Sequence, residues 1–176
     1  MNKDKEFEIF FKRYYTPLGM YVLHICGNTS EAEDIVQEAF SAIWQKCRAE
    51  GLPENLKSYL YRTAHNLTVD RIRKGLIAAA SIPLSKIEDT MPTEEAIDTS
   101  ERDARLWLEI SRLPQRCREV FLLSKQDGLT NAQIADTLGI SIKTVESQMT
   151  KAFKALRQTL SPTTGLSRHV FFLPFL

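Results

Sequence analysis

Apolar side chains recur three and four positions apart along most of the chain, and this spacing constrains the fold more than any other feature. The first such run comprises Phe7, Phe10, Phe11, Tyr14, Tyr15, Leu18, Tyr21, Val22 and Ile25. This spacing places the side chains on one face of an α-helix. No segment shows the strict alternation of apolar and polar residues that predicts a β-strand. The sequence therefore predicts an all-α fold.

Turn and cap signals predict where the first two helices begin and end. Thr16-Pro17 interrupts the first helix, either as a kink or as an N-cap followed by proline at the first helical position. Ser30 and Glu33 match a capping box, in which each side chain bonds the backbone N–H of the other residue. A second helix is expected to start there and to stop near Gly51.

A third helix is expected from about Asn55 to Lys74, so residues 1–74 should form one compact helical domain. Residues 75–103 then contain seven acidic and two basic residues, two prolines and little amphipathic order. That composition is typical of a flexible linker, here an acidic one with at most a short helical turn. Residues 161–176 form a tail of unknown role, in which six of the last eight residues are apolar.

Residues 104–160 are expected to form a second helical domain that contains a helix-turn-helix. Thr130 and Gln133 match a capping box that opens a short helix through Leu138. Gly139-Ile140-Ser141 then predicts a tight turn, and a longer helix follows. A short capped helix, a glycine turn and a second helix that can enter a major groove are typical of this motif.

Projection of the second helix of this motif separates an apolar face from a polar arc. The apolar face holds Ile142, Val145, Met149, Ala152, Phe153, Leu156 and Leu160. The polar arc holds Lys143, Thr144, Ser147, Lys151 and Lys154, with Gln148 on its flank. Hydroxyl and amide groups can bond base edges, and ammonium groups can bond phosphates. Glu146 is expected at the border of the apolar face, as a flanking or ion-pair residue. The alternative is an αα-hairpin with a solvated basic face.

Three motifs resemble, in order, those of the extracytoplasmic-function (ECF) sigma factors of the sigma-70 family. SEAEDIVQEAFSAIWQK, from Ser30 to Lys46, resembles their helix that binds core RNA polymerase. NLKSYLYRTAHNLTVDRIRK, from Asn55 to Lys74, resembles their promoter-melting segment. LPQRCREVFLLSKQDGLTNAQIADTLGISIKTVESQMTKAFKAL, which begins at Leu113, resembles their domain that reads the −35 element. The resemblance spans about residues 7–160 and implies a region 2 domain, a linker and a region 4 domain.

The resemblance implies a polymerase-binding role for a polar row on the second expected helix. The row comprises Asp34, Gln37, Glu38, Ser41 and Gln45. From the residues alone, such a row is an ordinary solvated helix face. In the family this face grips the largest-subunit clamp of the polymerase, which implies core contacts for Asp34, Gln37, Glu38 and Ser41.

The resemblance likewise implies that the third expected helix and the loop before it engage the −10 element. Arg62, Asn66 and Arg73 share a stripe with Val69, and Lys74 follows. The side chains of these residues can donate hydrogen bonds to the separated DNA strand. Such bonds would offset the few kcal/mol that unstacking a base costs. Without the family, the same stripe is a solvent-facing row. Tyr59 and Tyr61 could stack on bases, although Tyr59 projects towards the packing side.

The implied partners are RNA polymerase core, through its clamp and flap regions, promoter DNA and an anti-sigma factor. The linker is implied to thread through the polymerase towards its active-site cleft and the RNA exit path, whereas from composition alone it is a solvated spacer. The tail can pack against a domain, bind a partner such as the anti-sigma factor, or be disordered.

No cofactor, metal site or catalytic residue is expected, because the glycines form no phosphate-binding loop and the histidines are scattered. Three unpaired cysteines, a charged N-terminus and no long apolar run predict a cytoplasmic protein without membrane insertion.

Two other functions remain open at this point: a stand-alone transcriptional regulator of the LuxR type, and a helical adaptor without a DNA role. The net charge of +1 argues against a DNA-binding protein only when it is taken over the whole chain. By segment, residues 75–103 carry 2 basic and 7 acidic residues, and residues 104–160 carry 9 and 5. The acidic connector therefore cancels a basic second domain.

Overall fold

The computed structural model describes residues 3–51, 53–77, 82–87 and 91–159. The described residues form eight helices and no strand, which confirms the all-α prediction. They divide into two compact units, and the division falls between Glu101 and Arg102, inside one helix. The apolar tail at residues 161–176 lies outside the described residues.

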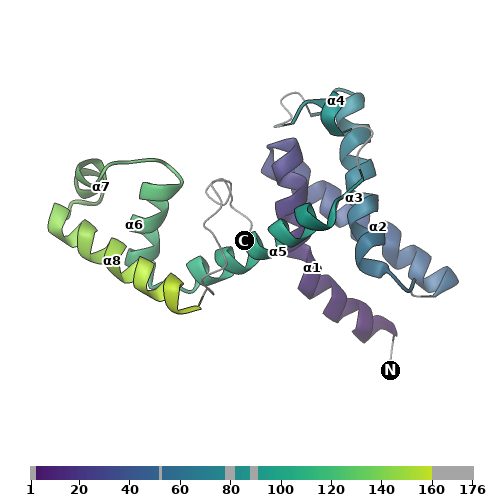
Figure 1. Cartoon of the computed structure of the whole chain (residues 1–176), viewed down its shortest axis with the longest axis horizontal. Coiled ribbons are helices and arrows are strands. Elements are labelled where there is room, and N and C mark those ends of the chain that lie inside the picture. The colour runs from purple at the N-terminus through teal and green to yellow at the C-terminus, as the bar shows by residue number, and fades with distance from the viewer. Residues whose placement is uncertain (1–2, 52, 78–81, 88–90, 160–176) are drawn as a thin grey trace. The chain divides into compact units, whose positions relative to one another are not determined.

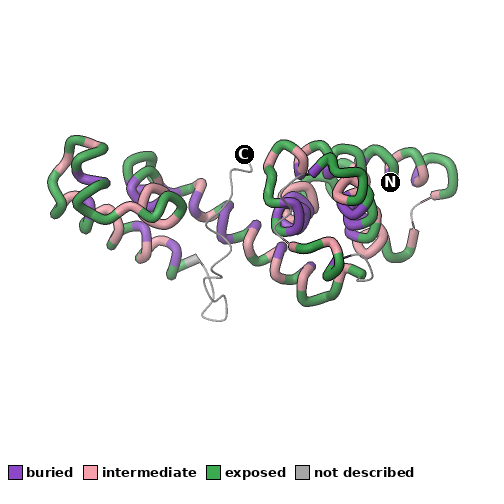
Figure 2. The backbone as a smooth tube through the Cα atoms, turned by 90° about the horizontal axis from the view of Figure 1, so that it is seen from above, coloured by how far each residue is buried: buried purple, intermediate pink, exposed green. Residues whose placement is uncertain are grey.

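The N-terminal unit is built on α1 (Lys3–Cys26), α2 (Thr29–Glu50) and α3 (Leu56–Arg73), each of which contacts the other two (Figure 1). Buried positions concentrate where these helices face one another, and the outer turns are exposed (Figure 2). Side chains from all three fill the core: Leu18, Val22, Ile35, Ile43, Leu60 and Tyr61 are fully buried. The helical spacing in the sequence is thus satisfied by mutual burial of three apolar faces.

The start of α2 differs from the sequence-based expectation. Gly27 has φ +68° and reverses the chain after α1, a backbone conformation that glycine adopts without steric cost. Asn28 is the N-cap of α2, and its side-chain oxygen accepts a hydrogen bond from the backbone N–H of Glu31 at 3.0 Å. The predicted capping box at Ser30 and Glu33 is therefore wrong, because asparagine two residues earlier already fills the cap position.

Two other boundaries agree with the sequence, and one alternative is excluded. Helix α2 ends at Glu50 with Gly51 as its C-cap, and α3 begins after Asn55. Pro17 lies inside α1, which continues on both sides of it. Because the helix is continuous, Pro17 does not mark a new N-terminus.

The expected flexible linker is largely ordered where the structure describes it. It contains α4 (Leu84–Ile87) and the first part of α5 (Glu94–Ser111). Three of its four isoleucines, Ile77, Ile87 and Ile97, are each at least 94% buried. Composition does not reveal this packing, because the buried isoleucines are few and are widely spaced among many charged residues.

Buried hydrogen bonds fix this connector to α3 and, through α3, to α1. The Tyr61 and Ser100 hydroxyls lie 3.0 Å apart, and Nε2 of His65 lies 3.2 Å from the carbonyl oxygen of Ile87. A carbonyl only accepts, so Nε2 of His65 donates to it. In the neutral imidazole, Nδ1 then accepts from the Tyr21 hydroxyl at 2.8 Å. Burial raises the pKa of Tyr21 above its ordinary value and keeps this donor protonated.

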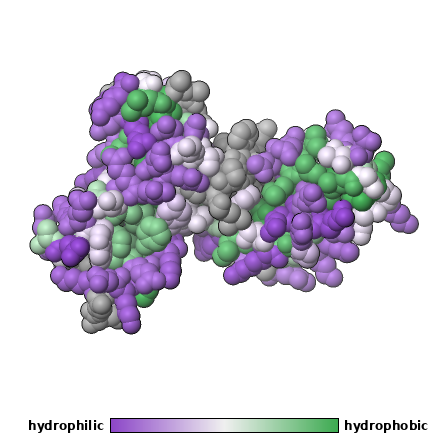
Figure 3. All heavy atoms as spheres, turned by 180° about the vertical axis from the view of Figure 1, so that it is seen from behind, coloured by the Kyte–Doolittle hydropathy of each residue, from purple (hydrophilic) through white to green (hydrophobic). Residues whose placement is uncertain are grey.

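The second unit contains the end of α5 and α6 (Gln115–Lys125), α7 (Asn131–Leu138) and α8 (Ile142–Thr159). Helices α6, α7 and α8 contact one another in pairs. Val120, Ile134, Ala135 and Val145 form their buried core, and half-buried side chains such as Leu123 and Met149 pack around it. On the face drawn in Figure 3, hydrophilic side chains cover most of the described surface of each unit, with hydrophobic patches between them.

Ile97→Ala tests whether the connector belongs to the N-terminal unit. We expect this change to lower the free energy of unfolding by about 2–5 kcal/mol, because it removes a buried side chain and leaves a cavity. Chemical denaturation followed by circular dichroism measures the change. Ile9→Ala, at a position 65% exposed, is the control and should change stability by no more than about 0.5 kcal/mol. Equal, small effects of both changes would show that the connector is a solvated spacer.

Candidate functional site

The turn between α7 and α8 has the geometry predicted for a helix-turn-helix. The Thr130 hydroxyl accepts from the backbone N–H of Gln133 at 3.3 Å, and Oε1 of Gln133 accepts from the backbone N–H of Thr130 at 2.9 Å. Gly139 adopts the left-handed conformation (φ +62°, ψ 37°) that ends α7. Ser141 then accepts from the backbone N–H of Thr144 at 3.1 Å and caps α8. The capping box at Thr130 is confirmed.

Helix α8 presents a cationic outer face. Lys143, Ser147, Lys151 and Lys154 are exposed, whereas Thr144 and Gln148 are half-buried. The Thr144 hydroxyl lies 2.8 Å from that of Ser141 and so takes part in the cap of the helix. Within the described part of the chain, no ion pair involves the three lysines, so their ammonium groups are available to phosphates.

One residue of α8 differs from the helical projection. Ile142, predicted on the buried face, is 48% exposed. It is the first residue of α8, where the helix starts and neighbouring side chains cover it poorly. Glu146, expected as a flanking or ion-pair residue beside this face, is exposed. Of the rest of that face, Val145, Ala152 and Leu156 are each at least 96% buried, and Met149 and Phe153 are half-buried. Leu160 lies outside the described residues.

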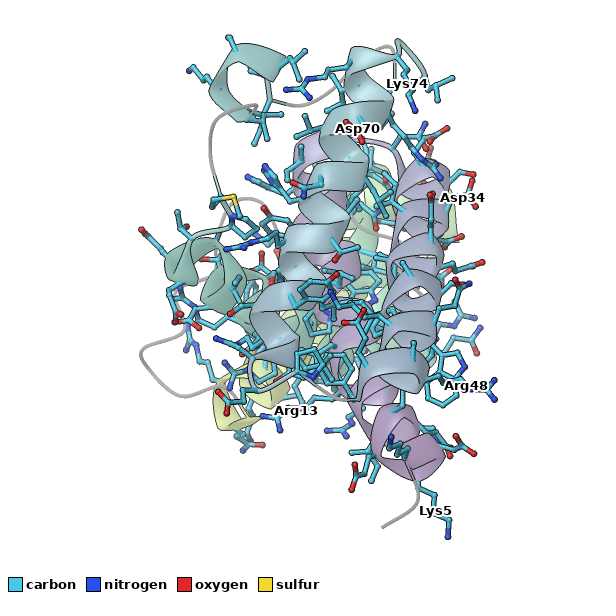
Figure 4. All side chains as sticks on the ribbon, turned by 90° about the vertical axis from the view of Figure 1, so that its right-hand side faces the viewer. Lys5, Arg13, Asp34, Arg48, Asp70 and Lys74 are labelled. Carbon is cyan, nitrogen blue, oxygen red and sulfur yellow. The ribbon has the colours of Figure 1, made fainter. Side chains whose placement is uncertain are left out.

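The polar row of α2 is brought together as expected. Asp34, Gln37, Glu38, Ser41 and Gln45 are all exposed. They lie opposite a stripe whose members, including Ile35, Ala39 and Ile43, are fully buried. Figure 4 shows Asp34 at the outer edge of α2. The row is therefore accessible to a partner along about three turns of one helix.

Arg71 of α3 contacts this row, and the sequence analysis did not single it out. Its Nη2 lies 2.8 Å from Oε2 of Glu38, and its Nη1 lies 2.9 Å from Oε2 of Glu31. Burial alone would lower the pKa of this guanidinium, but the hydrogen bonds with Glu38 and Glu31 outweigh it and raise the pKa. These partners are 33 and 40 residues away in the chain, so only helix packing reveals the contact.

The exposed side of α3 carries the four donors predicted to contact the −10 element. Arg62, Asn66, Arg73 and Lys74 are all exposed, and Lys74 is the C-cap of the helix. Asp70 and Lys74 lie near the C-terminal end of α3 in Figure 4. Val69, predicted on the same stripe, is 95% buried. The stripe is therefore narrower than expected, because its edge at Val69 belongs to the core.

The two tyrosines considered for base stacking differ in how far they are buried. Tyr61 is fully buried and bonded to Ser100, so it cannot stack on a base. Tyr59 is half-buried, and Nζ of Lys46 lies 3.2 Å from its hydroxyl and 4.6 Å from its ring centroid. The lysine thus covers one face of the Tyr59 ring.

The cysteines and histidines of the described residues form no metal site. Cys26, Cys47 and Cys117 are free and buried, and burial raises the pKa of each thiol. No group of three His, Cys, Asp or Glu side chains in the described segments could hold a metal ion. None of the helices described here is both long and apolar enough to cross a membrane.

Comparisons with known proteins match both units. The family Sigma-70 region 2 matches residues 10–75, and the family Sigma-70 region 4 matches residues 103–156. The chain is 32% identical over 149 residues to the ECF RNA polymerase sigma factor SigW of Bacillus subtilis, covering 76% of this chain and 78% of that protein. It is 30% identical over 151 residues to the ECF RNA polymerase sigma factor SigL of Mycobacterium tuberculosis, covering 81% and 82%. It is 27% identical over 152 residues to the ferric citrate uptake sigma factor FecI of Escherichia coli, covering 83% and 86%.

Proposed function

Because the chain belongs to the ECF RNA polymerase sigma factors of the sigma-70 family, we propose how its exposed faces divide the work of promoter-specific initiation. The observation that carries the proposal is the ordered pair of family matches, region 2 on the first unit and region 4 on the second. A stand-alone regulator of the LuxR type is not favoured, since its helix-turn-helix would leave the region 2 match without a role.

We assign core binding to the polar row of α2. Asp34, Gln37, Glu38 and Ser41 contact the largest-subunit clamp, and region 4 meets the flap. Exposure of the whole row, opposite a buried stripe that fixes the orientation of α2, supports this assignment. Carboxylates and amides at this spacing suit a polar helical partner that carries basic groups.

We assign the −10 element to Arg62, Asn66, Arg73 and Lys74, and the −35 element to the outer face of α8. On α3, three cations and one amide hold a displaced strand through its phosphates and base edges. On α8, Lys151 and Lys154 contact phosphates, while Lys143, Thr144, Ser147 and Gln148 face base edges. The half-burial of Thr144 and Gln148 makes Lys143 and Ser147 the leading readers of the sequence.

The domain assignment follows from these roles. Residues 1–74 serve as the region 2 domain, residues 75–103 as the connector and residues 104–160 as the region 4 domain. We further propose that the chain acts in the cytoplasm with the polymerase, that an anti-sigma factor controls it, and that it performs no catalytic step and needs no cofactor.

Asp34→Lys combined with Gln37→Ala tests the core-binding face. We expect weaker binding to core RNA polymerase, because the change reverses one charge and removes one amide from the centre of the row. Equilibrium titration with purified core measures it, and DNA binding by α8 should not change. Glu8→Lys, a charge reversal at an exposed site of α1, is the control and should bind core normally. Unchanged core affinity in the double variant would refute the assignment.

Lys151→Ala and Ser147→Ala separate phosphate contacts from base reading on α8. Loss of Lys151 should weaken holoenzyme binding at all promoters. It should also reduce the slope of log K against the logarithm of salt concentration by about one, as expected for the loss of one phosphate contact. Loss of Ser147 should instead change the preferred −35 sequence, with a salt dependence like that of the parent chain. Promoter titrations at several salt concentrations and selection from a randomised −35 element measure the two effects. Altered sequence preference in Lys151→Ala with an unchanged salt slope would show that the two roles are reversed.

A further inference from the structure

The Arg71 guanidinium joins two carboxylates of α2 that lie two helical turns apart. It meets Glu38 at 2.8 Å and Glu31 at 2.9 Å, one terminal nitrogen to each. The side chain of Arg71 is 22% exposed, that of Glu31 30% and that of Glu38 51%. The contact is therefore shielded on the Arg71 side and open to solvent on the Glu38 side.

Glu38 belongs to the polar row, and Glu31 does not. Both lie on the side of α2 next to α3, so a single arginine can reach them. A planar guanidinium with several N–H donors can hold two carboxylates in fixed directions, which a lysine ammonium does less well. One oxygen of Glu38 is thus engaged by α3, while half of its side-chain surface remains accessible.

We propose that Arg71 is a positioning residue of the core-binding face, which holds the Glu38 carboxylate in the orientation that core RNA polymerase contacts. This inference rests on the proposed function of the polar row. Arg71 does not itself touch the polymerase. It limits the rotamers of Glu38, so that less side-chain freedom is lost when the partner binds.

The same contact joins the two proposed interfaces of the N-terminal unit. Arg71 belongs to α3, whose exposed Arg62 and Asn66 are assigned to the −10 element, and Glu38 belongs to α2. Arg71 therefore bridges the helix assigned to core binding and the helix assigned to the −10 element, within a packing that their apolar faces determine.

Arg71→Gln tests the proposal in titrations of the full chain with core RNA polymerase. We expect the Kd to rise about three- to tenfold, and Arg71→Lys to recover part of the loss because an ammonium can still hold Glu38. Glu38→Gln should weaken binding similarly, and adding Arg71→Gln to it should cause little further loss. Lys12→Gln removes one positive charge from an exposed ion pair on α1 and is the matched control, with unchanged affinity expected.

Glu31→Gln distinguishes positioning from general stability. It weakens the other contact of Arg71 and leaves Glu38 bound, so melting temperature should fall while core affinity stays within twofold of the parent. If Glu31→Gln weakened core binding as much as Arg71→Gln does, the role of Arg71 would be structural and the proposal overturned. Tighter core binding by Arg71→Gln would also overturn it, because Arg71 would then compete with the polymerase for Glu38.

The Asp34→Lys, Gln37→Ala variant separates failure of this proposal from failure of the proposed function. If that variant lost core affinity while Arg71→Gln and Arg71→Lys bound normally, the polar row would stand and the positioning role would be refuted. If none of these variants lost affinity, the assignment of the row and the role of Arg71 would both be wrong.

Discussion

The buried stripe of α2 is the feature on which both proposed interfaces of the N-terminal unit depend. Ile35, Val36 and Ile43 are fully buried between α1 and α3, and each contributes about 1.5–3 kcal/mol relative to an exposed side chain. Exposed ion pairs contribute about 0.2–1 kcal/mol each. Apolar packing therefore decides which way α2 faces, and Arg71 acts on the direction of one carboxylate within that arrangement.

The same division between an apolar face and a polar face governs α8. Val145, Ala152 and Leu156 attach it to its own unit, and its lysines then face outward. The turn at Gly139 and the cap at Ser141 determine where the helix starts, and hence which residues are presented first. Charge also differs between segments, since the acidic connector offsets the positive charge of the unit that contains α8.

Helical periodicity predicted most of the fold, because each main helix buries one continuous stripe. It also predicted the exposed row of α2 and the exposed lysines and Ser147 of α8, since those lie opposite the stripe, although Thr144 and Gln148 are half-buried. Helical periodicity does not reveal contacts between residues far apart in the sequence, and it predicts burial poorly for a residue at the end of a helix. Nothing in the sequence pattern indicates that Arg71 reaches Glu38, that Tyr61 bonds Ser100, or that Ile142 is left uncovered at the start of α8.

We expect this chain to direct RNA polymerase to promoters rather than to act on DNA alone. Run-off transcription with purified core, on candidate promoters of its host, tests it most directly when paired with footprinting of the chain without core. A sigma factor should give a promoter-dependent transcript only when chain and core are both present, and the chain alone should protect the promoter weakly. Absence of any such transcript, together with tight binding of an operator by the chain alone, would contradict it.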